Sequence, residues 1–247
     1  MKFKVLASSS SGNCYLIEND KEAIVIECGV PFMEVKKAID FNVSKIACVL
    51  LSHEHGDHAK YAREYIDSGI PVLMSRGTAE MIGADVERGI RSGYWYQHGR
   101  FNVAPFRTEH DCAEPFGFLI RHPDCGTFLF ATDTQFVNFD FAEFRLNHIA
   151  IECNYEESRL DRAVEQGAIP EAVKNRIMKS HMSLETCKRF VKNNSSSSLD
   201  TVTLLHLSDG NSDERLFKEE ITGVVRKETK VFVADNGLTV DLNIVPW

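Results

Sequence analysis

Three histidines and one aspartate occur within six consecutive residues, 53–58, whose sequence is HEHGDH. Imidazole and carboxylate groups are the usual protein ligands of zinc, manganese and iron. Side chains of extended backbone alternate in direction, so His53 and His55 point to the same side, and Gly56 lets the chain turn. Asp57 and His58 can then face a second point nearby. The spacing therefore suits two adjacent metal ions, and a histidine-rich surface loop without a metal is the alternative.

The cluster directly follows an apolar run over residues 46–51, which is one of a series of short runs along the chain. These runs are rich in Val, Ile, Phe and Thr and are bounded by Gly, Pro, Asn or Asp, a pattern that predicts β-strands. The predicted strands cover residues 3–7, 14–17, 23–28, 46–51, 71–74, 101–106, 116–120, 127–131, 148–153, 201–207, 230–234 and 238–244. The cluster is therefore expected where a strand ends and a loop begins.

Helical spacing of apolar residues appears between these runs. Residues 32–39 place apolar side chains on one face behind Pro31, a favoured first helical residue. Ser183 is a suitable N-cap for a helix over 184–191, and acidic residues open a further helix over 212–221. The strands come in groups with helices interspersed, which favours two packed sheets flanked by helices over one doubly wound parallel sheet. The polar stretch 193–200 is expected to be an exposed loop rather than a domain linker.

Length and composition fit one globular domain over residues 1–247, with no room for an appended module. The hydrophobic fraction of 43% and the charged fraction of 26% argue against a disordered chain and against a coiled coil. The 28 basic and 36 acidic residues give a net charge of 28 − 36 = −8. This balance argues against a nucleic-acid binder that relies on charge alone.

The sequence also restricts the cellular location. It contains no apolar run of about 18 residues or more, so no transmembrane helix is expected. Its first residues lack the pattern of a signal peptide. The seven cysteines are scattered and include no Cys-x-x-Cys pair, which argues against a disulfide framework and against a thiolate zinc site. We therefore predict a cytoplasmic protein with no membrane association.

The HEHGDH segment after an apolar strand resembles the signature of the metallo-β-lactamase-fold hydrolases. Further segments, in the same order along the chain, are similar to the YycJ/WalJ-like branch of that superfamily. They are SSSSGN at 8–13, TEHD at 108–111 followed by FGF at 116–118, ATDT at 131–134, SHMS at 180–183 and LHLS at 205–208. The resemblance implies a single α/β domain, a four-layer αββα sandwich of two mixed β-sheets flanked by helices, with two metal ions at one edge.

Carried over position by position, the resemblance also implies a ligand set for two divalent ions, zinc or else manganese or iron. It assigns His53, His55 and His110 to the first ion, Asp57, His58 and His206 to the second, and Asp133 to a bridging position. Three of these residues (His110, Asp133 and His206) lie at or near the end of a predicted strand, where a side chain can be aimed with little backbone freedom. The alternative for His110 is an exposed loop histidine, and the alternative for Asp133 is a helix N-cap. For His206 it is a core histidine whose hydrogen bonds are satisfied within the protein.

Other histidines and one acid receive separate interpretations. His181 resembles a His-x-Ser/Thr element that phosphodiesterase and ribonuclease members place near the scissile phosphate, and the alternative is a histidine that merely flanks a helix. Glu27 stands where the family usually has Asp, and we expect it to support the metal-binding loop from behind. The sequence predicts that His98 and His122 lie on the surface and that His148 flanks the strand over 149–153.

Two metal ions at such a site can share a hydroxide that attacks a phosphorus or a carbonyl carbon. In this scheme Asp57 binds metal and holds the nucleophilic water, and His181 stabilises phosphate charge or protonates the leaving oxygen. We predict a phosphodiesterase, specifically a nuclease acting on DNA or RNA. A hydrolase of a small ester, lactone, thioester or lactam is the alternative, and a non-catalytic metal-binding protein is a third hypothesis.

The stretch 83–100 is a candidate surface for a nucleic-acid substrate. It interleaves basic and aromatic residues, which could form a wall on which bases stack. Those residues are Arg88, Arg91, Tyr94, Trp95, Tyr96 and Arg100. The alternative is a loop whose aromatic side chains cap the core.

Overall fold

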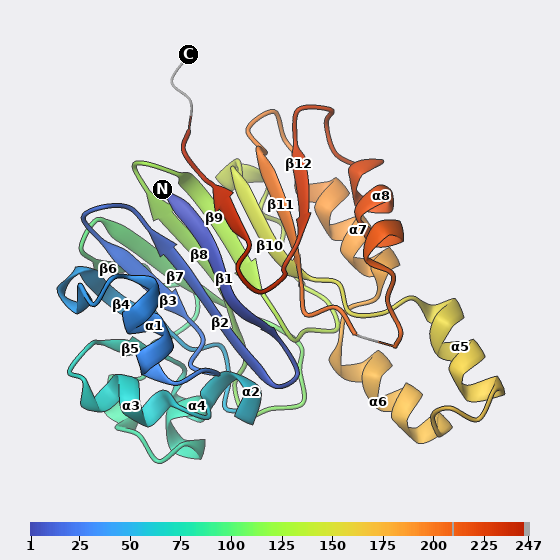
Figure 1. Ribbon diagram of the computed structural model, residues 1–247, viewed down its shortest axis with the longest axis horizontal. Helices are drawn as coiled ribbons and strands as arrows, with labels where there is room; N and C mark the ends of the chain where they lie inside the picture. The colour runs from blue at the N-terminus through green and yellow to red at the C-terminus, as the bar shows by residue number, and fades with distance from the viewer. Residues whose placement is uncertain (209, 245–247) are drawn as a thin grey trace. The chain divides into compact units, whose positions relative to one another are not determined.

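Two mixed β-sheets with helices make up the fold, in a computed structural model that describes residues 1–208 and 210–244 (Figure 1). The six-stranded sheet has the order β13-β1-β2-β3-β4-β5, and the seven-stranded sheet has the order β12-β11-β10-β9-β8-β7-β6. The first sheet consists of β1 (Lys2–Ser9), β2 (Gly12–Glu18), β3 (Ala23–Ile26), β4 (Ile46–Leu50), β5 (Val72–Leu73) and β13 (Thr239–Asp241). The second consists of β6 (Tyr96–His98), β7 (Phe101–Arg107), β8 (Phe116–His122), β9 (Gly126–Ala131), β10 (His148–Glu152), β11 (Thr201–Leu205) and β12 (Lys230–Val233).

The chain divides into two compact units, and it passes between them several times. The first unit comprises residues 1–106, 112–126 and the segment from Ala234 onward, and the second comprises residues 107–111 and 127–233. The expectation of one domain over residues 1–247 stays a prediction.

The first unit is organised around strands that are buried on both faces. All seven residues of β2 and all four of β3 are buried, as the apolar runs predicted. β3 and β4 are parallel, so their carboxyl ends lie at the same edge of the sheet. Helix α1 (Phe32–Ala38) contributes Phe32 to the core, where its ring packs at a tilt of 47° against that of Tyr65, with 4.8 Å between centroids. Each such buried side chain contributes about 1.5–3 kcal/mol of hydrophobic stabilisation.

The second unit contains four consecutive parallel strands, β9 to β12. Ile151 of β10 lies opposite Ala131 of β9, and Glu152 lies opposite Leu205 of β11. Helix α7 (Leu184–Asn194) packs on β10, and helix α8 (Glu214–Thr222) packs on β12. Because neighbouring parallel strands end at the same edge, the residues that follow β9, β10 and β11 are brought together there.

The predicted strands are all present with small shifts of their ends, and three predicted helices are confirmed as α1, α7 and α8. Pro31 precedes α1 as its N-cap rather than being its first residue. Ser183 caps α7 through Thr186 N, as predicted. The elements that the sequence did not reveal are β6, α2 (Gly56–Ala59), α3 (Ala62–Asp67), α4 (Arg76–Met81), α5 (Glu157–Glu165), α6 (Glu171–Ser180) and the 3-10 turns Val43–Lys45, Val86–Arg88 and Ala142–Phe144. Most are one or two turns long, which is too short for a periodic pattern to stand out.

The prediction that His122 lies on the surface is wrong. His122 is buried, and its Nε2 donates to Glu22 Oε1 at 3.0 Å while its Nδ1 accepts from the Asp124 amide. These two bonds satisfy the ring, so a buried imidazole costs little there. His148 lies within β10 rather than beside it, and it is also buried, with Nδ1 2.9 Å from Thr201 Oγ1.

Candidate metal centre

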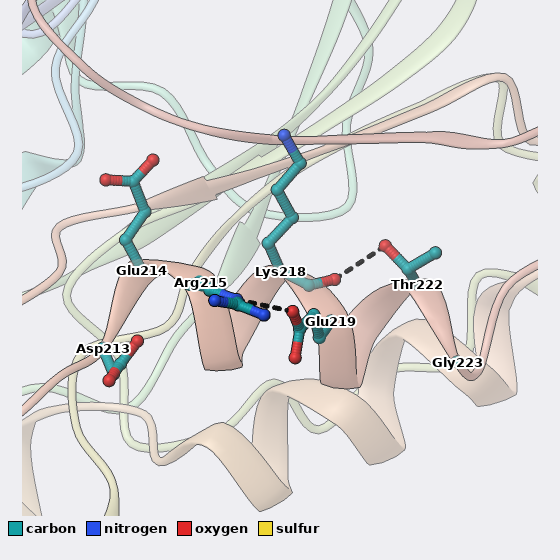
Figure 2. Close-up of a pocket in the computed structure, with 7 residues that line it drawn as sticks. All are labelled: Asp213, Glu214, Arg215, Lys218, Glu219, Thr222 and Gly223. Atoms are coloured by element: carbon teal, nitrogen blue, oxygen red, sulfur yellow. Dashed lines mark hydrogen bonds and ion pairs between the residues drawn. The ribbon is translucent and has the colours of Figure 1, made fainter.

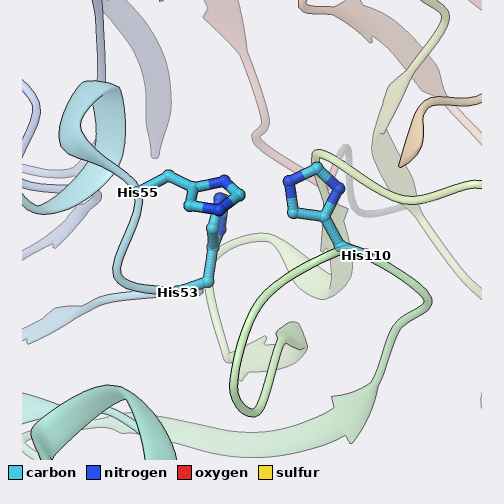
Figure 3. Close-up of side chains that lie close together, drawn as sticks. All are labelled: His53, His55 and His110. Carbon is cyan, nitrogen blue, oxygen red and sulfur yellow. The ribbon is translucent and has the colours of Figure 1, made fainter. Parts of the chain in front are cut away.

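The histidines of the HEHGDH segment gather on the loop that leaves β4. The ring centroids of His53 and His55 are 4.7 Å apart, and those of His53 and His58 are 4.2 Å apart. Figure 3 draws the imidazoles of His53 and His55 on this loop, together with His110, which follows β7. Ser52 Oγ lies 2.8 Å from His53 Nδ1 and fixes the orientation of that ring. The loop thus places three imidazoles close together, and imidazole is a usual ligand of zinc, manganese and iron.

Asn13 connects the first turn of the chain to this loop. The side chain of Asn13 is fully buried, and its Nδ2 lies 3.1 Å from Asp57 Oδ2 and 3.2 Å from His58 Nε2. Its Oδ1 accepts from the Ser9 amide and from the Tyr15 hydroxyl. These contacts hold the amide in place, so Asn13 fixes the orientation of the Asp57 carboxylate. In the sequence, Asn13 was only part of a family segment and carried no assigned role.

Glu27 lies behind the same loop, as predicted from its position in the family pattern. Its side chain is fully buried, with Oε2 3.4 Å from His58 Nδ1 and 3.3 Å from the Ser52 amide. Its backbone adopts a φ of 70°, which is uncommon for a residue with a side chain. A carboxylate against the far nitrogen of a metal-binding histidine fixes the tautomer and raises ligand basicity. The geometry thus agrees with a supporting role, which stays a prediction.

In the second unit, Asp133 and His206 meet at the carboxyl edge of the parallel strands. His206 Nδ1 donates to Asp133 Oδ1 at 2.6 Å, and the Thr132 hydroxyl donates to the same oxygen at 2.8 Å. Both residues have positive φ, 43° for Asp133 and 53° for His206, because each lies where the chain turns out of its strand. The two hydrogen bonds give the buried Asp133 carboxylate the polar partners that its charge requires. The helix N-cap interpretation of Asp133 does not apply, because the next helical turn begins only at Ala142.

Glu152 is a functional candidate that the sequence reasoning missed. It ends β10, is fully buried, and accepts from His181 Nδ1 at 2.6 Å. Its other oxygen accepts from the amides of Thr134 and Met182. The sequence contained a signal for this role. An acid at the end of a largely apolar strand needs partners for its charge, as at Asp133.

The pKa of His181 lies above its ordinary value. Burial lowers its pKa, but the charge and hydrogen bond of Glu152 more than offset this, and the pKa rises to about 9. The ring of His181 packs edge-on against the rings of His110 and His206, with 5.5 Å between centroids in each pair. His181 therefore sits among the other polar residues of this unit rather than merely flanking α7.

His110 occupies the short segment of the second unit that follows β7. Its Nδ1 donates to the Ser180 carbonyl at 2.7 Å, and its Nε2 lies 3.9 Å from Asp133 Oδ2. Burial lowers the pKa of His110 below its ordinary value, and the nearby Asp133 charge only partly offsets this. A neutral imidazole whose Nδ1 donates to a carbonyl is the usual state of a metal-binding histidine.

The donor set of the second unit fits a divalent metal. Asp133, Glu152, His181 and His206 each place a ligand atom within 4.8 Å of those of the others. Nitrogen and oxygen donors of this kind suit zinc, manganese and iron. Each unit thus contributes a compact group of predicted ligands: His53, His55, Asp57 and His58 in the first, and His110, Asp133 and His206 in the second.

The stretch 83–100 presents aromatic side chains to solvent, so it does not merely cap the core. Tyr94 and Trp95 are exposed, and the Arg121 guanidinium lies 4.6 Å from the Trp95 ring centroid. Two of the predicted basic residues are neutralised: Arg88 pairs with Asp85, and Arg100 pairs with Glu22 and Asp124. The predicted wall is therefore more aromatic than basic.

A hollow along helix α8 shares no residue with the predicted ligands. Figure 2 shows its lining residues, from Asp213 to Gly223, all on one face of the helix and its end. Arg215 pairs with Glu219, and the Thr222 hydroxyl donates to the Lys218 carbonyl. These groups satisfy one another, so the hollow offers no chemistry comparable to the histidine groups.

Comparison with known proteins defines the class. The sequence profile of the metallo-beta-lactamase superfamily matches residues 9–142, which is more than half of the chain. The chain belongs to the metallo-beta-lactamase superfamily. The predicted fold class of two mixed sheets with helices and the predicted resemblance are therefore confirmed.

Particular relatives lie within this class. Exodeoxyribonuclease YycJ of Bacillus anthracis is 25% identical over 246 residues, covering 92% of this chain and 90% of that protein. The crystal structure of the metallo-beta-lactamase fold protein YhfI from Bacillus subtilis has a TM-score of 0.72 and 15% identity, covering 97% of this chain and 99% of that one. Human tRNase Z, short form, has a TM-score of 0.66 and 14% identity, covering 99% and 100%. At these identities the two structures show a common fold.

Across residues 1–208 and 210–244, none of the helices has both the length and the apolar character needed to cross a bilayer. This agrees with the prediction that the chain has no transmembrane helix.

Proposed function

We propose that this chain is a dinuclear-metal-dependent phosphodiesterase that cleaves nucleic acid. In the proposal two divalent ions, zinc or else manganese or iron, bind to the seven predicted ligands. His53, His55 and His110 would hold the first ion, Asp57, His58 and His206 would hold the second, and Asp133 would be a ligand of both. Membership of the metallo-beta-lactamase superfamily, the packed imidazoles of His53 and His55, and the donor group that contains Asp133 and His206 support this assignment.

Bound ions of this kind lower the pKa of a water to near neutrality and stabilise charge on phosphate oxygens. The residues of the chain then have separate tasks. Asp57, held by Asn13 and still partly exposed, orients the attacking water. His181, held by Glu152, donates a proton to the oxygen that leaves the phosphorus.

The buried hydrogen bond between Glu152 and His181 is the observation that carries the proposal. A phosphodiester is an anion whose leaving oxygen gains negative charge as its bond to phosphorus breaks. A histidine fixed by Glu152 beside the donor group of Asp133 and His206 is placed to contact the phosphate and to supply a proton to that oxygen. A neutral ester or lactam has no anionic group for such a histidine to contact in the ground state. The geometry therefore favours the phosphodiester over the carbonyl substrate.

The relatives agree with this choice at the level of the reaction. The names of exodeoxyribonuclease YycJ and tRNase Z both describe nucleases, one for DNA and the other for tRNA. We extend to this chain the class of reaction and leave the choice between DNA and RNA to experiment. None of the cysteines, all of which lie within the described residues, forms a disulfide, which supports the cytoplasmic location as part of the proposal.

The test is metal analysis joined to a substrate panel. The purified protein should bind two metal ions per chain and hydrolyse bis-p-nitrophenyl phosphate, and it should cleave at least one of single-stranded DNA, double-stranded DNA and RNA. Chelation should abolish these activities, and readdition of metal should restore them. Two bound metals with hydrolysis of a lactam, thioester or lactone alone would overturn the phosphodiesterase proposal in favour of the carbonyl substrate.

Point variants sharpen the test. Asp57→Ala and His55→Ala should each lower kcat/KM by about 100-fold or more, because each removes a metal ligand or the group that orients water. His98→Ala is the matched control, since His98 is half-buried and belongs to neither donor group. Near-normal turnover by a folded Asp57→Ala protein would contradict the assigned role of Asp57.

A further inference from the structure

A hollow in the second unit lies between helix α7 and the loop that follows Asp133. Its lining combines the loop side chains Phe136 and Phe139 with Thr186, Arg189 and Asn193 of α7. The three α7 residues recur at intervals of three and four, so they form one stripe on the helix surface. The hollow is thus built from a loop and one helix face of the same unit.

The aromatic side chains of the hollow are unusually accessible. Phe136 is 37% exposed and Phe139 is 48% exposed. Beneath them, the buried rings of Phe141 and Phe190 pack with 6.3 Å between centroids, and Phe139 lies 6.2 Å from Phe141. The Phe139 ring therefore packs on a buried aromatic pair while about half of its side chain stays accessible to a flat ligand.

The hollow is lined by one acidic and one basic side chain, Asp140 and Arg189, and Asp140 Oδ1 accepts from the Ala142 amide at 2.8 Å. Arg189 is exposed, and among residues 1–208 and 210–244 no carboxylate forms an ion pair with it. The neighbouring Lys188, in contrast, pairs with both Glu185 and Glu220. A guanidinium without an acidic partner, next to accessible aromatic faces, is suited to a phosphate attached to a flat base.

Hydrogen bonds join the loop that lines the hollow to the donor group of the second unit. Phe136 follows Asp133 by three residues, and the Thr134 hydroxyl donates to the Phe136 carbonyl at 2.7 Å. The Thr134 amide in turn donates to Glu152 at 2.7 Å. At the other end of the loop, the Phe141 amide donates to Asn194 Oδ1 at 2.9 Å. These hydrogen bonds connect the loop that lines the hollow to the donor group. A ligand in the hollow would therefore have a fixed position relative to the residues to which we assign the reaction.

We propose that this hollow binds an unpaired base of a single-stranded nucleic acid, with the ring of Phe139 stacked on the base and Arg189 at the adjoining phosphate. The inference rests on the proposed phosphodiesterase function and names its substrate class. Single strands are favoured because a base can stack on protein only when it is not already stacked and paired in a duplex.

The test measures binding apart from cleavage. A fluorescein-labelled ten-nucleotide DNA is titrated with protein in EDTA, first as a single strand and then as a duplex, and fluorescence anisotropy is followed. The single strand should bind more tightly. Phe139→Ala should weaken single-strand binding by about 5- to 100-fold, the range for losing one base–aromatic stack. Phe139→Leu, which keeps an apolar side chain without the ring, should weaken it similarly and replaces the alanine variant if that variant does not fold.

Matched controls separate the hollow from general surface effects. Phe41→Ala removes another exposed phenylalanine, and Lys192→Ala removes another exposed α7 cation, neither of which lines the hollow. Both controls should bind as wild type does, whereas Arg189→Ala should bind more weakly. Equal single-strand affinity of wild type, Phe139→Leu and Arg189→Ala, or a preference for the duplex, would overturn the inference.

The two proposals fail in different ways. Wild-type hydrolysis of bis-p-nitrophenyl phosphate, which has no nucleobase, tests the phosphodiesterase function alone. Hydrolysis of that compound together with unaltered oligonucleotide binding by the hollow variants would refute the base-binding hollow and leave the function standing. Absence of phosphodiester hydrolysis would refute the function, and the anisotropy titration would still decide whether the hollow binds single strands.

Discussion

Replacing Gly29 by alanine should disrupt the metal-binding loop from a position outside the histidine cluster. Gly29 lies between two backbone segments, and its amide donates to the Asn13 carbonyl at 2.9 Å. A Cβ built on Gly29 would lie 1.9 Å from the Asp57 carbonyl oxygen and 2.4 Å from the Asn13 amide nitrogen. Both neighbours are backbone atoms, so neither can swing aside as a flexible side chain could.

The size of the effect follows from these distances. Ordinary van der Waals contact begins at 3.4 Å, so the backbone at Asp57 or Gly29 must move by 3.4 − 1.9 = 1.5 Å. Overpacking of this kind costs about 1–3 kcal/mol, and loss of the Gly29–Asn13 hydrogen bond adds about 1 kcal/mol. The free energy of unfolding should therefore fall by about 2–4 kcal/mol, and the displaced Asp57 should bind metal more weakly.

The assay pairs urea denaturation of the metal-free protein with metal titration of the folded protein. Gly56→Ala is the matched control, because Gly56 belongs to the same loop and a Cβ there would meet nothing within 4 Å. At the start of α2 this control should leave stability unchanged or raise it by about 0.4–1 kcal/mol. Unfolding and metal affinity of Gly29→Ala equal to those of Gly56→Ala would refute the steric argument.

Further outcomes are expected at residues that support the site or the fold. Asn13→Ala should lower metal affinity about 10- to 100-fold by releasing Asp57, measured by competition with a chelating dye, and wild-type affinity would show that Asn13 does not position it. Glu152→Gln and His181→Ala should each lower kcat/KM on bis-p-nitrophenyl phosphate about 100-fold, with a double variant no worse than either; additive losses would indicate separate roles. Burial alone would raise the pKa of Glu18, but its pairs with Lys4 and Lys45 outweigh this and lower the pKa below its ordinary 4.5. The pairs therefore stabilise the fold above pH 4.5 and lose that effect as the pH falls through the lowered value, so the stability advantage of wild type over Glu18→Gln should shrink in acid, and an advantage constant down to pH 3 would contradict the linkage.

Local patterns in the sequence were enough for much of the fold. The strands were predicted because short alternating or continuous apolar runs bounded by turn residues indicate β-strands wherever they occur in the chain. The helices α5 and α6 were missed because each buries a single residue, Leu160 in α5 and Ser180 in α6, so neither carries the wide apolar face that marks a helix in a sequence. His122 was misplaced for the opposite reason: a histidine after a strand has no local sign that Glu22, 100 residues away, will satisfy it inside the protein.

The sequence by itself was enough to predict the candidate ligands of the HEHGDH segment, since their spacing is local and needs only the period of extended backbone. It also marked Asp133, because a charge at the end of a buried strand must have partners. The tertiary structure alone decided which side chains support these residues. Asn13 reaches Asp57 across 44 residues of chain, and Glu152 reaches His181 across 29. The physical reason is that such pairs depend on strand register and on the edge where parallel strands end, and no local periodicity encodes either.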